Sequence, residues 1–234
     1  MTNNPQKVKT SEKVQNTETL QDTFSQSEEF LSKYRNLILG AIGLVVLAVA
    51  GVIFYNHNNE QQNAEAQQAM FPAVFYFEAD SLERALHGNE RSPGLLNIAT
   101  DYSNTKAGNL ANFYAGVIFM RQNQFDDAIK HLKQFSSEDL LLQARAYSLI
   151  GDAYMEQENF EQAVSYYKKA ADYKPNEQFT PNYIMKAALA FELKNDFSSA
   201  VGMYDRIISK YPRSQEFNDA KKLKARAETL ASNQ

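Results

Sequence analysis

The sequence predicts an all-α protein in which a single transmembrane helix is followed by a solenoid of helical repeats. Three observations support this class: an uncharged apolar run at residues 37–55, a motif that recurs three times between residues 109 and 214, and the lack of the apolar and polar alternation typical of strands. The chain has 234 residues, enough for one folded body of ordinary size with attached segments.

Composition excludes several kinds of site and partner. The chain has no cysteine, so disulfides, thiolate metal sites and cysteine nucleophiles are ruled out. The net charge is -4, and no basic face is evident, so we expect no nucleic-acid partner. Residues 1–36 are polar and carry few large apolar groups, which predicts a flexible cytoplasmic tail. Within it, residues 27–34 form either a short amphipathic helix that runs into the membrane helix or a solvated linker.

The apolar run is long enough to cross a membrane. From Leu37 to Tyr55 no residue is charged, and as a helix this segment would rise about 28 Å. The hydrocarbon core of a bilayer is roughly 30 Å thick, so we expect a transmembrane helix at 37–55. A cleaved signal peptide is the alternative, because residues 48–50 (AVA) resemble a cleavage site. The long preceding region and the continuing apolar run favour an uncleaved anchor.

Basic residues near the span predict its orientation. Lys33 and Arg35 stand directly before it, and the next basic residue is Arg84. Lys and Arg concentrate on the cytoplasmic side of membrane helices. We therefore expect a cytoplasmic N-terminus and a large C-terminal part on the far side.

The internal repeat is the most specific feature of the sequence. Residues 122–128 (QNQFDDA), 157–163 (QENFEQA) and 194–200 (KNDFSSA) each have a polar turn, a Phe, two polar residues and an Ala. The Phe residues at 125, 160 and 197 are separated by 35 and 37 positions. This period is close to the 34 residues of a tetratricopeptide repeat (TPR).

The middle copy resembles the TPR pattern throughout. Its matching residues are Tyr147, Ile150, Gly151, Tyr154, Phe160, Ala163, Tyr167, Ala170 and Pro175. Gly151 and Ala163 are small, which lets the two helices of the repeat cross closely, and Pro175 ends the second helix. The other copies supply Gly116, Phe119, Phe125, Ala128 and Leu132, and Ala188, Phe191, Phe197, Ala200, Tyr204, Ile207 and Pro212. Three copies, at 109–214, are about the minimum for a stable stack.

Helical segments are expected on both sides of the repeats. Residues 215–234 form a charged helix with an apolar side, suited to capping the open end of a solenoid. Residues 56–108 hold an outer helix that continues the membrane helix to Glu78, with a kink at Pro72, and then a degenerate helical pair with a loop at 88–94.

The repeat pattern also predicts where a partner would bind. In a TPR one side of each first helix lines the concave surface, and counting from the motif predicts a peptide-binding groove. Its residues are Phe113, Val117, Met120 and Arg121, then Ser148, Asp152, Met155 and Glu156, and finally Met185, Leu189 and Glu192. Methionines suit a surface that adapts to varied apolar segments. The alternative is that the three methionines are covered by flanking helices and simply pack.

The sequence contains no recognisable constellation for catalysis. His57, His87 and His131 lie far apart and in no metal-ligand spacing, and no phosphate-binding loop or nucleophile motif occurs. We expect His57 at the membrane surface and the other two on solvated helix ends or loops. We therefore predict no catalytic residue, metal, cofactor or small-molecule substrate, and no enzyme activity.

The order of polar tail, anchor helix, outer helix and TPR units resembles the ancillary SecYEG translocon subunit family of bacterial membrane-anchored TPR proteins. That resemblance implies a single-pass protein of the bacterial inner membrane with a periplasmic repeat domain. It also implies work beside the export channel on translocated or envelope proteins. Phe113 and Val117 replace the Lys and Asn with which some TPRs grip a C-terminal carboxylate, so that mode is not expected.

Two functions remain open from the sequence. A chaperone-like receptor for newly translocated chains would bind many partners weakly. A structural scaffold docking one fixed envelope complex would form one tight complex. TPR motifs specify a fold, whereas the groove residues set the partner, and an apolar, Met-bearing groove favours the first function.

Overall fold

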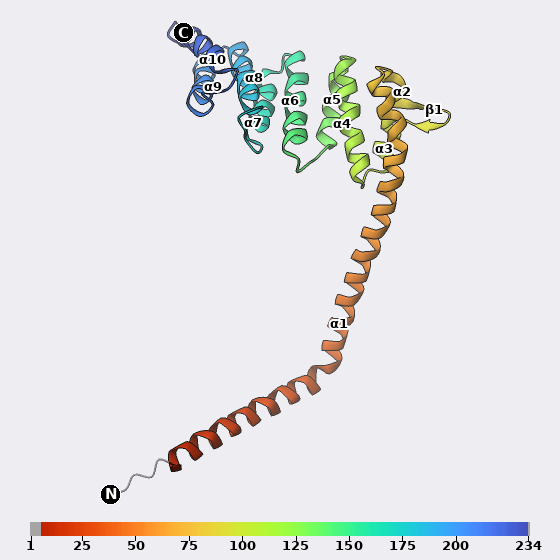
Figure 1. Ribbon diagram of the computed structural model, residues 1–234, viewed down its shortest axis with the longest axis vertical. Coiled ribbons are helices and arrows are strands. Elements are labelled where there is room, and N and C mark those ends of the chain that lie inside the picture. Colours follow the sequence, from red (N-terminus) through yellow and green to blue (C-terminus); the bar gives the residue numbers. More distant parts are fainter. Residues whose placement is uncertain (1–5, 234) are drawn as a thin grey trace. The chain divides into compact units, whose positions relative to one another are not determined.

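The computed structural model describes residues 6–233, and the side chains of residues 33–233 other than Ile38 and Ala41. Over this range the chain folds into helices α1 to α10 and one short hairpin (Figure 1). Its contacts divide it into two units, residues 1–58 and residues 59–234. The predicted fold class is confirmed, because an all-α repeat domain follows a long apolar helix.

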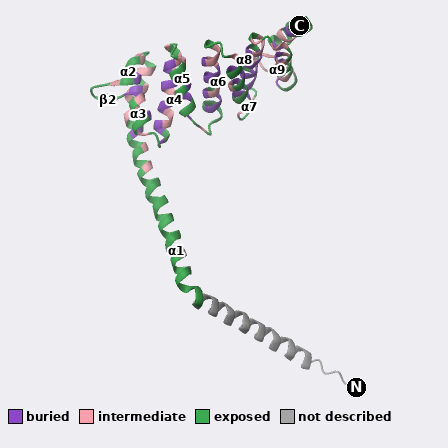
Figure 2. Ribbon diagram, turned by 180° about the vertical axis from the view of Figure 1, so that it is seen from behind, coloured by how far each residue is buried: buried purple, intermediate pink, exposed green. Residues whose placement is uncertain are grey.

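Helix α1 (Gln6–Glu78) contains the predicted membrane segment. The stretch Lys33–Glu78 includes a strongly apolar window, none of it buried within the structure (Figure 2). By length and composition this helix fits a single membrane anchor or a signal segment. Residues 6–36, expected as a flexible tail, are helical instead. The stretch from Gln6 to Leu39 has no Gly or Pro and many Glu, Gln and Lys residues, which favour helix. Residues 1–5 lie outside the described part.

The last part of α1 belongs to the repeat domain. Ala73 is buried there in a cluster with Leu95 and Ile98, and Phe77 packs against it. The Asn63 side-chain oxygen accepts a hydrogen bond from the Ala107 backbone N–H at 3.0 Å. The helix runs on through Pro72. Residues 59–78 therefore act as the first helix of the domain.

Two short helices follow α1 in the region expected to hold a degenerate pair. They are α2 (Leu82–His87) and α3 (Leu95–Asp101). The expected loop between them is a small antiparallel hairpin of β1 (Gly88–Asn89) and β2 (Ser92–Pro93). Gly88 has φ 75°, and a Cβ there would lie 2.3 Å from the Ser92 carbonyl oxygen, so glycine suits this turn.

Three helix pairs and a final helix form the rest of the domain, stacked side by side (Figure 1). The pairs are α4 (Lys106–Arg121) with α5 (Phe125–Gln134), α6 (Leu140–Glu156) with α7 (Phe160–Asp172), and α8 (Thr180–Leu193) with α9 (Phe197–Lys210), and α10 (Phe217–Ala231) packs on α9. The Phe of each motif copy begins a second helix. The Ala that follows it, Ala128, Ala163 or Ala200, is fully buried.

The turn inside each pair has the same backbone conformation. Asn123, Glu158 and Asn195 have φ values of 59°, 55° and 59°, in the left-handed region. The next residue in each copy donates its N–H to a carbonyl five residues earlier, at 2.9, 2.8 and 2.9 Å. This pattern is typical of helix C-termini, and Asn adopts the left-handed region more readily than most residues. The repeated polar turn of the sequence thus encodes one repeated geometry.

The glycine of the middle repeat faces an aromatic ring. A Cβ on Gly151 would lie 2.6 Å from Cε1 of Tyr167, which is far inside van der Waals contact. The sequence suggested that Ala163 sets this requirement, but the atoms closest to Gly151 belong to Tyr167. The first copy repeats the arrangement, with 2.5 Å between the corresponding Cβ on Gly116 and Cγ of Leu132.

A pair of substitutions tests this crossing. We expect Gly151→Ala to destabilise the domain by about 1–3 kcal/mol, because the Tyr167 ring must move. Gly202, in α9, has no atom within 4 Å of such a Cβ, so Gly202→Ala should stabilise by roughly 0.5–1 kcal/mol through helix propensity. Thermal unfolding of the full-length chain in detergent measures both. If both substitutions changed the stability equally, the close contact between Gly151 and Tyr167 would be contradicted.

The sequence predicted that His131 would be solvated, but the structure contradicts this. The His131 side chain is half-buried on α5, where it packs against α4. Its ring stacks on Phe119 at a centroid distance of 5.3 Å, and its Nδ1 is 2.9 Å from Oδ1 of Asn112. The Asn112 amide nitrogen donates to the Gly108 carbonyl, so Oδ1 accepts and His131 Nδ1–H donates. Burial lowers the pKa of His131 below its usual value, and Lys130 lowers it further.

This lowered pKa predicts a pH dependence of stability. The unfolded chain binds a proton at His131 more readily than the folded chain does, so stability falls as the pH drops through about 6.5 towards the folded pKa. Above about pH 6.5 the neutral His131 no longer makes the stability of the folded chain depend on pH. In the variant His131→Gln, the midpoint of thermal unfolding should fall less between about pH 7.5 and pH 5.5 than in the parent. The same fall in both proteins would show that His131 does not titrate in this way.

Candidate protein-binding face

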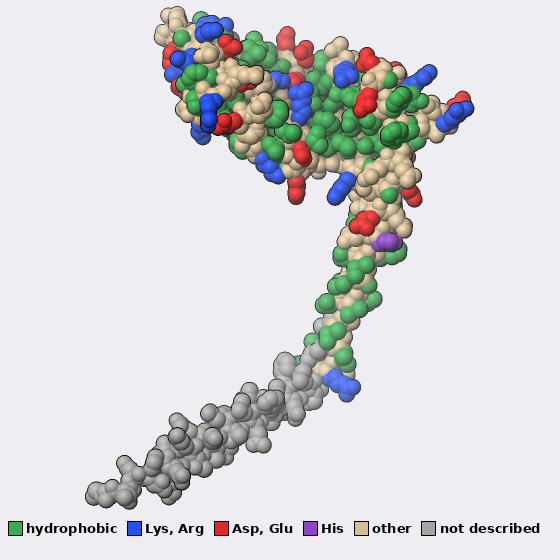
Figure 3. All heavy atoms as spheres, viewed as in Figure 1, with side chains coloured by type: hydrophobic (Ala, Val, Ile, Leu, Met, Phe, Trp, Pro, Cys, Tyr) green, Lys and Arg blue, Asp and Glu red, His purple; other side chains and the backbone are tan. Residues whose placement is uncertain are grey.

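The exposed apolar side chains of the repeats gather on the first helices. Between residues 106 and 216 the large hydrophobic residues that remain exposed are Leu140, Leu141, Leu142, Phe179, Leu189 and Leu193. Five of them lie in α6 or α8, and Phe179 directly precedes α8. Helices α5, α7 and α9 expose none. In the view of Figure 3, hydrophobic side chains gather over the part of the repeat domain where α4 and α5 lie in Figure 1, so the surface near the first repeat is apolar as well.

The first-copy residues of the predicted groove mostly pack. Phe113, Val117 and Met120 are half-buried against a cluster that includes Leu132 and Ile150, and the Phe113 ring lies 5.1 Å from that of Phe135.

Arg121 is exposed at the end of α4, where it contacts the end of α1 and the residues directly after it. Its guanidinium lies 4.7 Å from the centre of the Phe77 ring and 3.5 Å from Asp80. Arg121 of the predicted groove is therefore already in contact with residues at the end of α1 and just after it.

The second-copy residues divide between the interior and the surface. Ser148 is fully buried, so it does not reach solvent. Asp152 accepts hydrogen bonds from Tyr167 Oη at 2.7 Å and from Lys186 Nζ at 2.7 Å. Met155 packs half-buried against a cluster that includes Ala163, while Glu156 is exposed.

The third-copy residues also take part in the helix packing. Met185 packs half-buried in the cluster around Ile184 and Tyr204. The side chain of Glu192 is only 8% exposed, because it accepts from Tyr204 Oη at 2.9 Å and pairs with Arg226 of α10. Leu189 is 48% exposed, the largest exposed fraction among the apolar residues of the predicted groove.

Asp152 and Glu192 also raise the pKa values of the tyrosines that they contact. Burial raises the pKa of the Tyr167 hydroxyl, and the nearby Asp152 carboxylate raises it further. Burial raises the pKa of Tyr204 in the same way, together with its hydrogen bond to Glu192. Both phenols are therefore protonated donors near neutral pH. These carboxylates link neighbouring helices, which makes them structural.

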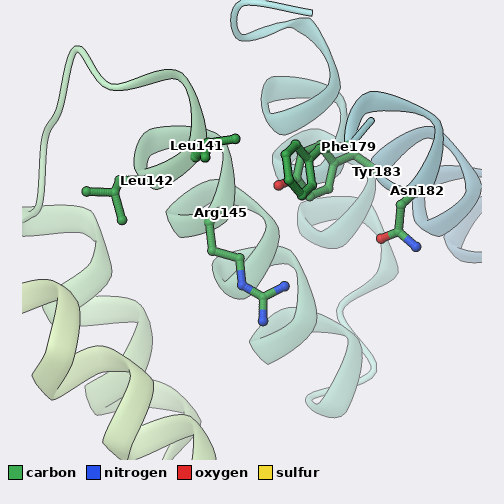
Figure 4. Close-up of a pocket in the computed structure, with 6 residues that line it drawn as sticks. All are labelled: Leu141, Leu142, Arg145, Phe179, Asn182 and Tyr183. Carbon is green, nitrogen blue, oxygen red and sulfur yellow. The ribbon is translucent and has the colours of Figure 1, made fainter. Parts of the chain in front are cut away.

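A pocket at one end of this face was not predicted from the sequence. It has a volume of about 330 Å³ and lies between the N-terminal turns of α6 and α8 (Figure 4). Its lining residues are Leu141, Leu142, Arg145, Phe179, Asn182 and Tyr183.

Two features of the sequence point to this pocket. Arg145 and Asn182 each stand six residues before the small residue of their motif copy, Gly151 or Ala188, one turn before the groove residues that were predicted. Residues 140–142 are three consecutive leucines directly after the helix cap Asp139. Successive residues point in different directions around a helix, so one packing face cannot bury all three.

Neither the geometry nor the side chains indicate a metal centre. Among the residues that the structure describes, no group of three or more His, Asp or Glu side chains is placed to hold an ion.

Family comparisons match the repeats. Two tetratricopeptide repeat models match, one over residues 114–177 and one over residues 183–214. Neither describes a catalytic family. No curated protein matches the chain.

Several solved structures are similar to this chain. The nearly identical TPR-like repeats of a kinesin light chain type protein from Podosopora anserina match with a TM-score of 0.54 and 11% identity, over 74% of this chain and 89% of that one. MamA protein matches with a TM-score of 0.50 and 18% identity, over 71% of this chain and 88% of that one. The N-terminal domain of stress-induced protein-1 from C. elegans has 20% identity and a TM-score of 0.43, over 49% of this chain and 93% of that one.

At these identities the first two of these structures show the fold alone. The family matches fall on the helix pairs that the motif predicted, and the long apolar helix precedes them. The chain therefore carries tetratricopeptide repeats in an all-α helical repeat domain, which follows a long apolar N-terminal helix.

Proposed function

We propose that this chain is a membrane-anchored adaptor that binds segments of other proteins on the face formed by its first helices. The observation that carries the proposal is the placement of exposed apolar side chains. They occur along α6 and α8 and are missing from α5, α7 and α9 among the described residues. Apolar groups that stay exposed together on a soluble domain mark interaction sites.

The chemistry of the face supports protein ligands. Leucine and phenylalanine side chains supply apolar contact, and the same two helices carry Met155 and Met185, which are half-buried and have adaptable side chains. Surfaces of this kind accept varied apolar segments. This favours a chaperone-like receptor of many partners over a scaffold for one fixed complex.

The location of the adaptor follows from the charge pattern at the apolar helix. Lys33 and Arg35 precede the span, whereas residues 56–83 contain no Lys or Arg. The positive-inside rule then assigns the repeats to the far side of the membrane, which is the periplasm in a bacterium. A position beside the export channel rests on the similar domain order of the ancillary SecYEG translocon subunit family.

A single cysteine tests both the location and the face. The chain has no cysteine, so Leu189→Cys provides a unique thiol on the proposed face. In intact bacterial cells a small membrane-impermeant maleimide should label this thiol. A photoreactive maleimide at the same thiol should then crosslink several different envelope proteins, identified by mass spectrometry.

Ser165→Cys is the matched control, because Ser165 is exposed on α7, away from the first helices. It should be labelled equally but capture few proteins. Labelling only after cell lysis would contradict the orientation. Equal capture from the two positions would contradict the binding face, and capture of one protein alone would favour the scaffold.

A further inference from the structure

The pocket between α6 and α8 has an apolar end and a polar end. Leu141 is 44% exposed and Phe179 is 42% exposed, and with Leu142 they form the apolar end, at the first turns of the two helices. Arg145 and Asn182 lie one turn further along (Figure 4). At about 330 Å³ the pocket is at the small end of the range for ligand sites, which suits one or two side chains.

Arg145 is the feature that the repeat architecture does not explain. It makes no ion pair with any residue that the structure describes, although other basic residues of the same two repeats do. Lys186 pairs with Asp152 at 2.7 Å, and Lys194 pairs with Glu161. Arg145 is exposed, and its charge is near Tyr183. A guanidinium without a partner at the edge of an apolar pocket is suited to bind a carboxylate.

The N-terminus of α8 also favours an anion in the pocket. No side chain caps this helix at Phe179, which lines the pocket, so the positive end of its dipole is not compensated there. At the N-terminus of α6, by contrast, the Asp139 carboxylate accepts hydrogen bonds from the Leu141 and Leu142 backbone N–H groups and offsets the dipole of that helix.

The spacing of the two ends defines the ligand more closely. Arg145 lies four positions after Leu141, a rise of about 6 Å along the helix. Asn182 lies three positions after Phe179, a rise of about 4.5 Å. In an extended peptide, side chains on the same face recur every two residues, at about 6.6 Å. An apolar side chain and an acidic side chain two positions apart would therefore reach both ends together.

We propose that this pocket binds an extended segment of a partner protein in which a large apolar residue and an Asp or Glu are separated by one residue. The apolar side chain lies between Leu141 and Phe179, and the carboxylate accepts hydrogen bonds from Arg145. Asn182 donates to the same segment. This inference rests on the proposed function and names the class of segment that the first-helix face selects.

The test uses a short fluorescent peptide, with its C-terminus amidated, that contains Leu-Ser-Asp between Gly and Ser residues. Fluorescence anisotropy with the full-length chain in detergent should detect binding. Replacing the peptide Asp with Asn, or making the variant Arg145→Glu, should each weaken binding by about tenfold, since a charge-assisted bond is lost. A Leu-Ser-Lys peptide should bind Arg145→Glu better than it binds the parent.

Arg91→Glu is the matched control, because Arg91 is exposed in the hairpin turn, away from the pocket, and the change in charge is the same. Its binding should equal that of the parent. Unchanged binding by Arg145→Glu, or no gain for the Lys peptide, would overturn the proposal. So would tighter binding of a peptide whose only carboxylate is its C-terminus. If crosslinking from Leu189→Cys still captures several proteins in those cases, the binding face stands and only the pocket assignment fails.

Discussion

The close contact between Tyr167 and Gly151 organises the middle of the repeat domain. The absent glycine side chain lets the ring of α7 lie against α6, and this position brings the phenol within 2.7 Å of Asp152. Asp152 in turn binds Lys186 of the next repeat. One missing Cβ thus connects the packing inside a helix pair to the contact between pairs, and the spacing of α6 and α8 depends on it.

That spacing also determines which surface is available to a partner. Asp152 and Glu192 of the predicted groove bind side chains of neighbouring helices. These two carboxylates are therefore already occupied and are not available to a partner protein. The first turns of α6 and α8 lack such contacts and keep apolar side chains exposed around Arg145. We therefore propose that partners bind at the first turns of α6 and α8, where side chains are not held by contacts between the helices.

The sequence predicted the helix pairs well because the motif is local. Each Phe begins a second helix, and each turn residue takes a left-handed conformation that the polar turn permits. The sequence could not show which first-helix side chains stay exposed, because the burial of a first-helix residue depends on the neighbouring repeat. Ser148 has a groove position yet is buried, whereas Arg145 sits one turn earlier and stays free of ion pairs within the described residues. His131, on the second helix α5, was misjudged for a different reason, because α4 of the same repeat covers it.

Hydrogen exchange of the full-length chain with and without the Leu-Ser-Asp peptide tests the central claim, that the first helices bind partners. Binding should slow exchange of backbone amides in the N-terminal halves of α6 and α8, because the bound segment restricts their opening. Helices α5, α7 and α9 should exchange as before. Protection confined to these second helices, or to the hairpin, would contradict the account.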